Sequence, residues 1–494
     1  MKPSAHLFHL IKSLSSREKR FYLRQVQKQK GGKDQLYLRL FHEIDKQDHY
    51  EEEKLKVAFA GSSFGKSLAF PKSHLYDQVL RTLQRLHHEV QIQGSLRSQL
   101  DKIEILVDRG LPAQAWRILQ KALKQALNFE QCLEILQLLR WKRRLVLRLQ
   151  PPAYPEELKA IAGLEKHWQK VFEKEQQAID LHDHLYALFQ ETRRKGGLEA
   201  DPDLEGLLRQ LNALKEDTQL HFAARIAALR GSAHLYHMRE DFVSVHTAYQ
   251  EEIQVWEAHP RQIKEAPLRF VRAFGQWLSS KALIRDYEQL LSETQRLRKY
   301  PDLGKRGEAE VFQITYNLEL FYYLNAGLES KAIALSDTIS VGIETYDKML
   351  LPSAKLGFFY NLALVHWLDG KNREALHWTR KILHFEKGEI RKDIRNFAPI
   401  LEKILHFDLG HISQLESWFR AFAYHKSKKE GSNRLEGVVL RLVKTCLDEE
   451  GAASHQKAYE AFLHELKNQA KQRGTSRLGL LELQKWAQRR LASL

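Results

Sequence analysis

The sequence predicts an all-α fold, a right-handed α-solenoid of antiparallel helical hairpins preceded by a basic helical N-terminal region. Leu, Ala, Glu, Gln, Lys and Arg dominate the 494 residues, and these side chains lose little conformational freedom in a helix. The chain contains only 12 prolines and 25 glycines, and runs rich in valine and threonine, which are typical of strands, are nearly absent. Apolar residues recur at three-and-four spacing in several segments, as amphipathic helices require.

A chain of this length exceeds one ordinary hydrophobic core, so several domains or one elongated array are expected. The proline-rich segment 150–155 is expected not to be helical and is the best boundary, because prolines interrupt a helix, and segment 427–433 is a further break. We therefore expect four regions: a basic helical region at 1–95, the first helical hairpins at 96–150, a helical repeat array at 151–425 and C-terminal capping helices at 426–494.

Local signals mark the starts of individual helices. Ser15 followed by Glu18 fits a capping box, in which each side chain bonds the backbone N–H of the other residue. Leu111-Pro112 starts another helix, because proline at the first helical position lacks only an N–H that has no helical acceptor there. One apolar stripe then follows at helical spacing: Ala115, Trp116, Ile118, Leu119, Ala122, Leu123, Ala126 and Leu127.

Four predicted hairpins share a glycine in the turn and a small or apolar residue five positions later. Glycine permits the left-handed end of the first helix, and the later residue lets the second helix approach closely. The glycines are 43 (327 to 370), 40 (370 to 410) and 217 (110 to 327) residues apart, the last close to five steps of 43. A weaker member turns at Glu240 and places Val245 in the same relation. The four pairs are Gly110 with Ala115, Gly327 with Ala332, Gly370 with Ala375, and Gly410 with Leu415.

The best of these hairpins resembles the tetratricopeptide family. Phe359, Leu362, Ala363, Gly370 and Ala375 follow the family pattern, with the two alanines as small contact positions. The resemblance covers the chain from about 95 to 425 in shape and from about 310 to 420 in motif. The hairpin period of 40–43 residues departs from the family's 34, and its second-helix aromatic residue and terminal proline are mostly missing. The resemblance implies protein or peptide binding on a concave face, without catalysis.

The first 150 residues differ from the rest of the chain in charge. The net charge of the chain is +16, and residues 1–150 carry +13 of it, from 28 Lys and Arg against 15 Asp and Glu. This asymmetry indicates an acidic partner for the first third of the chain: nucleic acid, an acidic protein surface or anionic lipid. A basic surface that only keeps the protein soluble is the alternative interpretation. Segments 7–15, 18–21 and 72–76 resemble the opening of a set of uncharacterised bacterial helical proteins, which implies no activity.

Two arginine stripes are candidate contact sites for such a partner. Arginines recur every four residues on the helix predicted at 130–149, around Trp141, and a second cluster lies beside Phe21 and Tyr22. Arginine next to aromatic rings suits phosphate contact combined with base stacking. Alternatively, the rings belong to the core and the arginines are only solvated. The candidate residues are Arg17, Arg20, Arg24, Arg140, Arg144 and Arg148.

A second candidate surface lies in the best repeats, where aromatic residues gather. Most of these rings are expected in the core. A few polar and aromatic side chains on first helices could instead line a concave peptide-binding groove, by analogy with other helical-repeat proteins. The candidates are Tyr316, Asn317, Tyr323 and Asn361.

One motif points to nucleotide chemistry. Residues 60–67 satisfy the loose phosphate-loop pattern, in which backbone amides and Lys66 would hold phosphates. Segments 55–59 and 103–108 would then have to be strands, although both also fit helices. Pro71 is expected to interrupt the long helix that a phosphate loop must open. These observations argue against a nucleotide site.

Cysteine usage and hydropathy exclude other classes. The two isolated cysteines, Cys132 and Cys446, predict buried inert thiols and no Cys-rich zinc site, so we expect no metal and no cofactor. No run of 18 apolar residues occurs, which predicts no membrane span. Histidines at positions 6 and 9 interrupt the apolar core that a signal peptide needs, so a cytoplasmic location is expected.

Three functional hypotheses follow. The first is a non-catalytic helical-repeat scaffold that binds a protein or peptide. The alternative is a nucleic-acid-associated or regulatory protein that uses the basic N-terminal third. The last is a nucleotide-binding enzyme that acts through Lys66.

Overall fold

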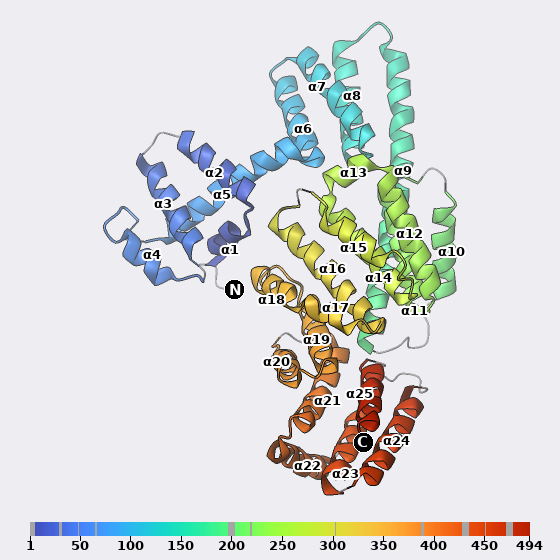
Figure 1. Ribbon diagram of the computed structural model, residues 1–494. Coiled ribbons are helices and arrows are strands. Elements are labelled where there is room, and N and C mark those ends of the chain that lie inside the picture. Colours follow the sequence, from blue (N-terminus) through green and yellow to red (C-terminus); the bar gives the residue numbers. More distant parts are fainter. Residues whose placement is uncertain are drawn as a thin grey trace. The chain divides into compact units, whose positions relative to one another are not determined.

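The protein is helical throughout the part of the chain that the structure describes (Figure 1). The computed structural model describes residues 5–28, 32–47, 49–64, 67–195, 203–217, 220–301, 303–386, 390–426, 434–449, 451–470 and 478–494. These residues form α1 to α25 and no strand, which confirms the predicted all-α class. None of the described helices combines the length and the apolar character that a membrane crossing requires.

The chain divides into two compact units, each assembled from separate segments. Unit 1 comprises 1–183, 207–229 and 255–267, and unit 2 comprises 184–206, 230–254 and 268–494. Four helices contribute three or more residues to each unit: α9 (Tyr154–Lys195), α10 (Leu204–Lys215), α11 (Phe222–Met238) and α12 (Phe242–Ala258). The four regions expected from the sequence remain a prediction.

The other helices belong to one unit each. Unit 1 contains α1 (His6–Ser13), α2 (Ser16–Lys28), α3 (Gly32–Lys46), α4 (Glu52–Phe59), α5 (Ala69–Val90), α6 (Ile92–Asp108), α7 (Pro112–Asn128), α8 (Cys132–Leu149) and α13 (Pro260–Glu265). Unit 2 contains α14 (Pro267–Leu283, except for its first residue), α15 (Leu290–Arg298), α16 (Gly304–Asn325), α17 (Glu329–Ala334), α18 (Ser336–Thr345), α19 (Pro352–Leu368), α20 (Asn372–Leu383), α21 (Lys392–Asp408), α22 (Ile412–Lys426), α23 (Arg434–Asp448), α24 (Ala452–Ala470) and α25 (Leu480–Ala492).

The first five helices of unit 1 enclose their own apolar core. Rings and aliphatic side chains from α1 to α5 meet there, including Phe41 and Leu75. The predicted capping box is confirmed, because the Ser15 N–H donates to the Glu18 carboxylate at 2.7 Å and the Glu18 N–H donates to Ser15 Oγ at 3.2 Å. This reciprocal pair uses backbone donors that have no helical acceptor at the start of α2.

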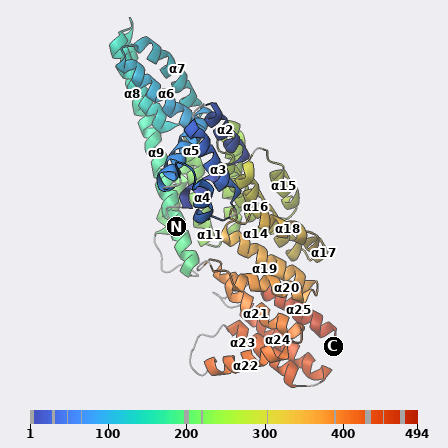
Figure 2. The ribbon, with the colours of Figure 1, turned by 90° about the vertical axis from the view of Figure 1, so that its left-hand side faces the viewer.

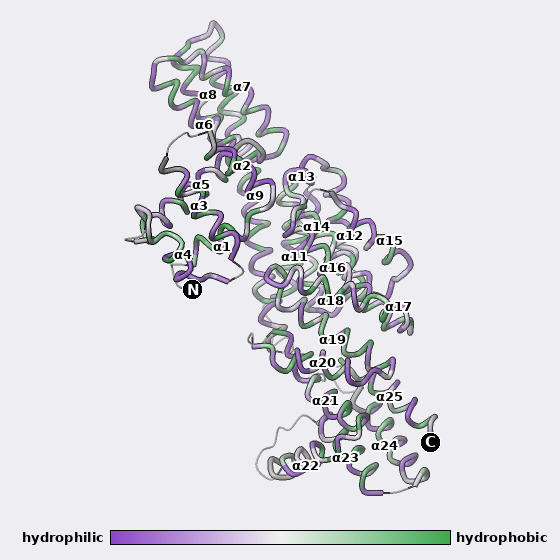
Figure 3. Tube along the Cα trace, turned by 60° about the vertical axis from the view of Figure 1, so that its left-hand side comes forward, coloured by the Kyte–Doolittle hydropathy of each residue, from purple (hydrophilic) through white to green (hydrophobic). Residues whose placement is uncertain are grey.

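The next three helices of unit 1 form an antiparallel group. Helices α6, α7 and α8 pack on one another and lie side by side in both Figure 1 and Figure 2. Proline occupies the first turn of α7, as predicted. The apolar stripe of α7 is divided, since Ala115, Leu119, Ala122 and Ala126 are buried while Leu127 is exposed. Figure 3 shows hydrophobic and hydrophilic residues alternating along these helices, as amphipathic packing requires.

The same type of turn connects the helices of several hairpins in both units. Gly110, Gly327, Gly370 and Gly410 all have positive φ, between 68° and 79°. In each turn the N–H of the next residue bonds the carbonyl five residues before it, for example Lys371 N–H to His366 O at 2.9 Å. This is the 6→1 bond of the Schellman motif, which satisfies a carbonyl that the ending helix leaves open. The predicted glycine turns are therefore confirmed.

The residue five positions after each turn is fully enclosed. Ala115, Val245, Ala332, Ala375 and Leu415 each have 0% of their surface exposed. The prediction that this position mediates the close approach of the two helices is consistent with its complete burial.

Two turns of the same kind were not predicted, because no glycine marks them. Glu130 and Arg285 have φ of 52° and 58°, and the residue after each bonds the carbonyl five residues earlier. Ile135 and Leu290, five positions later, are completely buried. The turn predicted at Glu240 also exists, with φ of 58°.

Two expectations about prolines are wrong. Segment 150–155 separates α8 from α9, but Tyr154 and Pro155 already belong to the first turn of α9. Pro71 likewise lies in the first turn of α5 and does not interrupt it. In both cases the missing N–H has no helical acceptor, so the proline costs no hydrogen bond. The break expected at 427–433 lies outside the described residues.

One buried carboxylate connects three helices of unit 2. Asp408, at the end of α21, accepts hydrogen bonds from Trp367 Nε1 of α19 at 3.3 Å and Trp486 Nε1 of α25 at 3.1 Å. It also pairs with Arg490 of α25 at 2.5 Å. The Asp408 side chain is only 4% exposed, so these donors replace the water that the charge would otherwise need. The last helix is thereby attached to the middle of the unit.

Opposite effects are expected from two glycine-to-alanine substitutions. Gly370→Ala should lower the free energy of unfolding by about 1 kcal/mol, because a Cβ disfavours its φ of 79°. Gly163→Ala should raise it by about 0.5 kcal/mol, because Gly163 lies inside α9 with open space around its Cα. Chemical denaturation of each variant measures its free energy of unfolding. A change in the same direction for both variants would contradict the role of the turn.

Acidification is expected to destabilise unit 2. Burial lowers the pKa of His366 and of His406, and for His406 the neighbouring His411 and Arg380 lower it further. The folded state then binds fewer protons than the unfolded chain. This contribution to stability is full above the unfolded pKa of about 6.5 and is lost as pH falls through the folded pKa.

Melting temperatures between about pH 7.5 and about pH 5.5 measure this effect. His406→Gln should make the melting temperature less dependent on pH than in the wild type, whereas the same change at the exposed His384 should not. Identical pH dependence in the two variants would refute the assignment.

Candidate partner-binding groove

Helix α8 separates its apolar and basic residues onto different faces. Ile135, Leu138, Leu139, Leu145 and Val146 are buried at helical spacing. The predicted stripe of Arg140, Arg144 and Arg148 is exposed along the helix. Among the described residues no carboxylate pairs with these three arginines, although Arg148 Nη1 donates to Val107 O at 3.2 Å.

The remaining basic residues of α8 have a structural role. Lys142 pairs with Glu157 at 3.1 Å, and Arg143 pairs with Glu165. Both carboxylates belong to α9, so these cations attach α8 to its neighbour. Lys142 and Arg143 therefore do not extend the arginine stripe, because their charges are already neutralised within unit 1.

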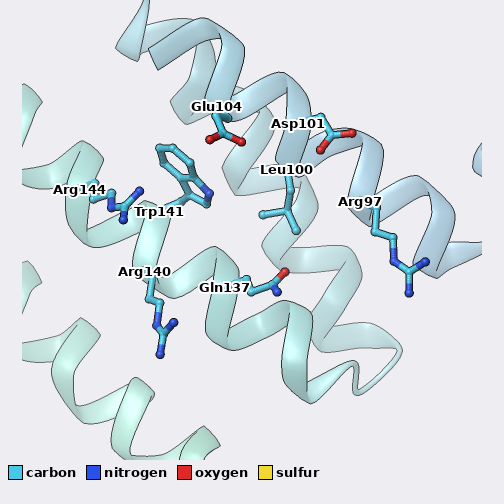
Figure 4. Close-up of a pocket in the computed structure, with 8 residues that line it drawn as sticks. All are labelled: Arg97, Leu100, Asp101, Glu104, Gln137, Arg140, Trp141 and Arg144. Atoms are coloured by element: carbon cyan, nitrogen blue, oxygen red, sulfur yellow. The ribbon is translucent and has the colours of Figure 1, made fainter. Parts of the chain in front are cut away.

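The stripe borders a groove between α6 and α8 (Figure 4). The groove has a volume of about 330 Å³. Figure 4 shows Trp141 extending from α8 toward α6, where Leu100 and Glu104 lie near it. The residues that line the groove are Arg97, Leu100, Asp101, Glu104, Gln137, Arg140, Trp141 and Arg144.

In this groove, side chains of both charge signs surround a small apolar floor formed by Leu100 and Trp141. The guanidinium of Arg144 lies 4.8 Å from the ring centroid of Trp141, a cation–π contact that holds the two side chains together. Asp101 and Glu104 supply exposed carboxylates one turn apart on α6. Arg97 and Arg140 supply exposed cations from opposite helices. The groove can therefore hold a ligand that presents an apolar side chain together with charges of both signs.

The α6 side of this groove was not predicted. Arg97, Leu100, Asp101 and Glu104 follow the spacing of one helix face, which is a signal that the sequence contains. That spacing does not tell which neighbouring helix the face meets, so only the packing of α6 beside α8 identifies the groove.

The second arginine stripe lies elsewhere in unit 1. Arg17, Arg20 and Arg24 are exposed on one face of α2. Helix α2 packs on α3 and α5, whereas α8 packs on α6 and α7, so the two stripes belong to different helix groups. Tyr22, expected beside the stripe, is 1% exposed and stacks on Phe41 at 4.8 Å. It therefore offers no ring for base stacking.

The candidates in unit 2 lie among the packed helices of that unit. The ring of Tyr316 lies 3.7 Å beneath the Arg298 guanidinium, and Asn317 Nδ2 donates to the Gln313 carbonyl at 2.9 Å. Tyr323 is 9% exposed and donates its hydroxyl to Glu319 at 2.9 Å. Asn361 is also 9% exposed. These four side chains stabilise contacts within unit 2 and do not form the groove described above.

The phosphate-loop-like segment has helical surroundings. Residues 52–59 form α4, and residues 103–108 belong to α6. Neither strand of a nucleotide-binding sheet is present at these positions. Gly65 and Lys66 themselves lie outside the described residues.

The described part of the chain offers little for metal or thiol chemistry. No group of three or more His, Cys, Asp or Glu there is placed to hold a metal ion. Cys132 is buried, and burial raises the pKa of its thiol. Comparisons with protein-family models, curated proteins and solved structures found no match for this chain.

Because some basic residues of α8 are paired and others are exposed, substitutions of the two kinds should affect stability unequally. Arg143→Gln should lower the free energy of unfolding by about 0.5 kcal/mol, because it removes a partly exposed ion pair to α9. Arg140→Gln makes the same charge change at an exposed position and should leave stability nearly unchanged. Urea denaturation compares them, and an equal loss would show that Arg140 has a structural partner.

Proposed function

We propose that this protein is a non-catalytic scaffold of the cytoplasm that binds a protein or peptide segment in the α6–α8 groove. Its hairpins form a right-handed, tetratricopeptide-like solenoid. The recurring Schellman turns and the buried residue five positions after each support a repeated hairpin unit.

The composition of the groove is the observation that carries this proposal. Tryptophan and arginine are enriched at the energetic centres of protein interfaces, and here Trp141 and Arg144 contact each other at the groove. Asp101 and Glu104 also line it, and two carboxylates would repel the phosphates of a nucleic acid. A protein segment can present both positive and negative side chains, which would complement the two charge signs of the groove.

The partner is described by the side chains that would fit. An aromatic or aliphatic side chain would cover Leu100 and Trp141 and exclude water from them. A carboxylate of the partner would lie between Arg97 and Arg140, and a cation would face Asp101 and Glu104. Complementary charges at these places would set the direction in which the segment lies.

Crosslinking from within the groove tests the proposal. A photoreactive residue at the exposed position of Gln137 in the full-length tagged protein should capture a discrete protein in nuclease-treated cell extract. The crosslinked segment should carry an apolar residue flanked by charges of both signs. Capture that disappears with nuclease would contradict a protein partner.

Binding of that segment should depend on Trp141. Trp141→Ala should weaken it by about 30-fold, the loss typical of an interface hot spot. Arg144→Glu should also weaken it, whereas Arg20→Glu, the same charge change on α2, should not. Titration calorimetry measures the affinities, and thermal unfolding checks that each variant is folded. Equal weakening by Arg144→Glu and Arg20→Glu would show that overall charge, not the groove, holds the partner.

A further inference from the structure

A second hollow lies on the opposite flank of α6 from the groove. Helices α5, α6 and α7 border it, and its volume is about 570 Å³. Its lining is polar and basic, with one aliphatic residue: Arg85, Ser95, Ser98, Gln99, Lys102, Arg117, Ile118 and Lys121.

Four cations from three helices converge at this hollow. Arg85 comes from α5, Lys102 from α6, and Arg117 and Lys121 from α7, and all four are exposed. Among the described residues no carboxylate lines this hollow, and none forms an ion pair with any of the four cations. Cations held together in this way repel one another, so an anion bound among them would relieve that repulsion.

The helical period keeps the acidic residues of α6 away from this basic hollow. Ser95, Ser98 and Lys102 share one flank, while Asp101 and Glu104 project on the flank that forms the groove. Leu96 and Ile103, fully buried, lie on the core face between the two flanks. The charged side chains among the described residues of the basic hollow are therefore all positive.

Serine hydroxyls add neutral hydrogen-bond donors. Gln99 Nε2 donates to Ser95 Oγ at 3.1 Å and to Gln125 Oε1 at 2.7 Å. The first bond occupies Ser95 Oγ as an acceptor and leaves its O–H available to donate. Serine hydroxyls and the N–H groups of Arg and Lys are typical contacts to phosphate oxygens.

We propose that the basic hollow binds the phosphodiester backbone of duplex nucleic acid without reading its base sequence. Four cations can each neutralise one phosphate. The described residues that line the hollow include no aromatic ring, so they provide no platform for stacking unpaired bases. One aliphatic residue, Ile118, is too little apolar surface for the core of a protein interface. This inference is independent of the groove and its protein partner.

The salt dependence of binding tests the inference quantitatively. The full-length protein is titrated with two short DNA duplexes of unrelated sequence, and fluorescence anisotropy gives the affinity. Four phosphate contacts predict an affinity loss of about 150-fold between about 50 and about 200 mM salt, equal for both duplexes. Removing two cations in the Lys102→Gln, Lys121→Gln double variant should reduce that loss to about 12-fold.

A matched control separates the hollow from overall charge. Arg97→Gln with Arg140→Gln makes the same charge change on the groove side of α6 and should keep the wild-type salt dependence. Trp141→Ala should keep it as well, so failure of the groove proposal is distinguishable from failure of this one. Melting temperatures confirm that all variants are folded.

Three results would overturn the inference. The first is an equal change in the two double variants, which would indicate a nonspecific effect of charge. The second is binding of the duplex that does not respond to salt. The third is tighter binding of poly-glutamate or phosphatidylserine vesicles than of duplex DNA. If the Lys102→Gln, Lys121→Gln variant also lost that tighter binding, the hollow would be a site for a different polyanion.

Discussion

The hairpins depend on a residue that accepts left-handed backbone where the first helix ends. At glycine this conformation has little steric cost, and three of the four glycine turns are followed five positions later by a buried alanine. Where the turn residue is Glu130, Glu240 or Arg285, the later residue is larger: Ile135, Val245 or Leu290. A left-handed residue with a Cβ costs about 1–2 kcal/mol, and full burial of a branched side chain contributes about 1.5–3 kcal/mol. Packing can therefore offset the strained turn.

Helical periodicity also gives α6 two surfaces with different chemistry. One buried line, represented by Leu96 and Ile103, attaches the helix to its neighbours. One flank combines both charge signs around an apolar floor, and the other presents cations and hydroxyls, with no carboxylate among the described residues that line it. These lining residues come from neighbouring turns of one helix, so a single element contributes to both proposed binding surfaces.

Neutralisation between helices decides which cations remain free for a partner. On α8, Lys142 and Arg143 are adjacent to the arginine stripe in sequence, yet they pair with carboxylates of α9. On α2, Lys19 pairs with Asp45 at 2.6 Å, while Arg17 and Arg24 are exposed. The surplus of positive charge in the first 150 residues is thus divided between attachments inside unit 1 and surfaces that face solvent.

Features that depend on a few neighbouring residues could be predicted from the amino-acid sequence. These are the helical class, the Ser15–Glu18 capping box, the four glycine turns and the shared exposed face of Arg140, Arg144 and Arg148. The place where α6 meets α8, and the hollow that α5, α6 and α7 border, follow only from the tertiary structure. It also decided the turns at Glu130 and Arg285, which local preference disfavours. The physical reason is that ion pairs, grooves and strained turns depend on contacts between residues that are distant in the sequence.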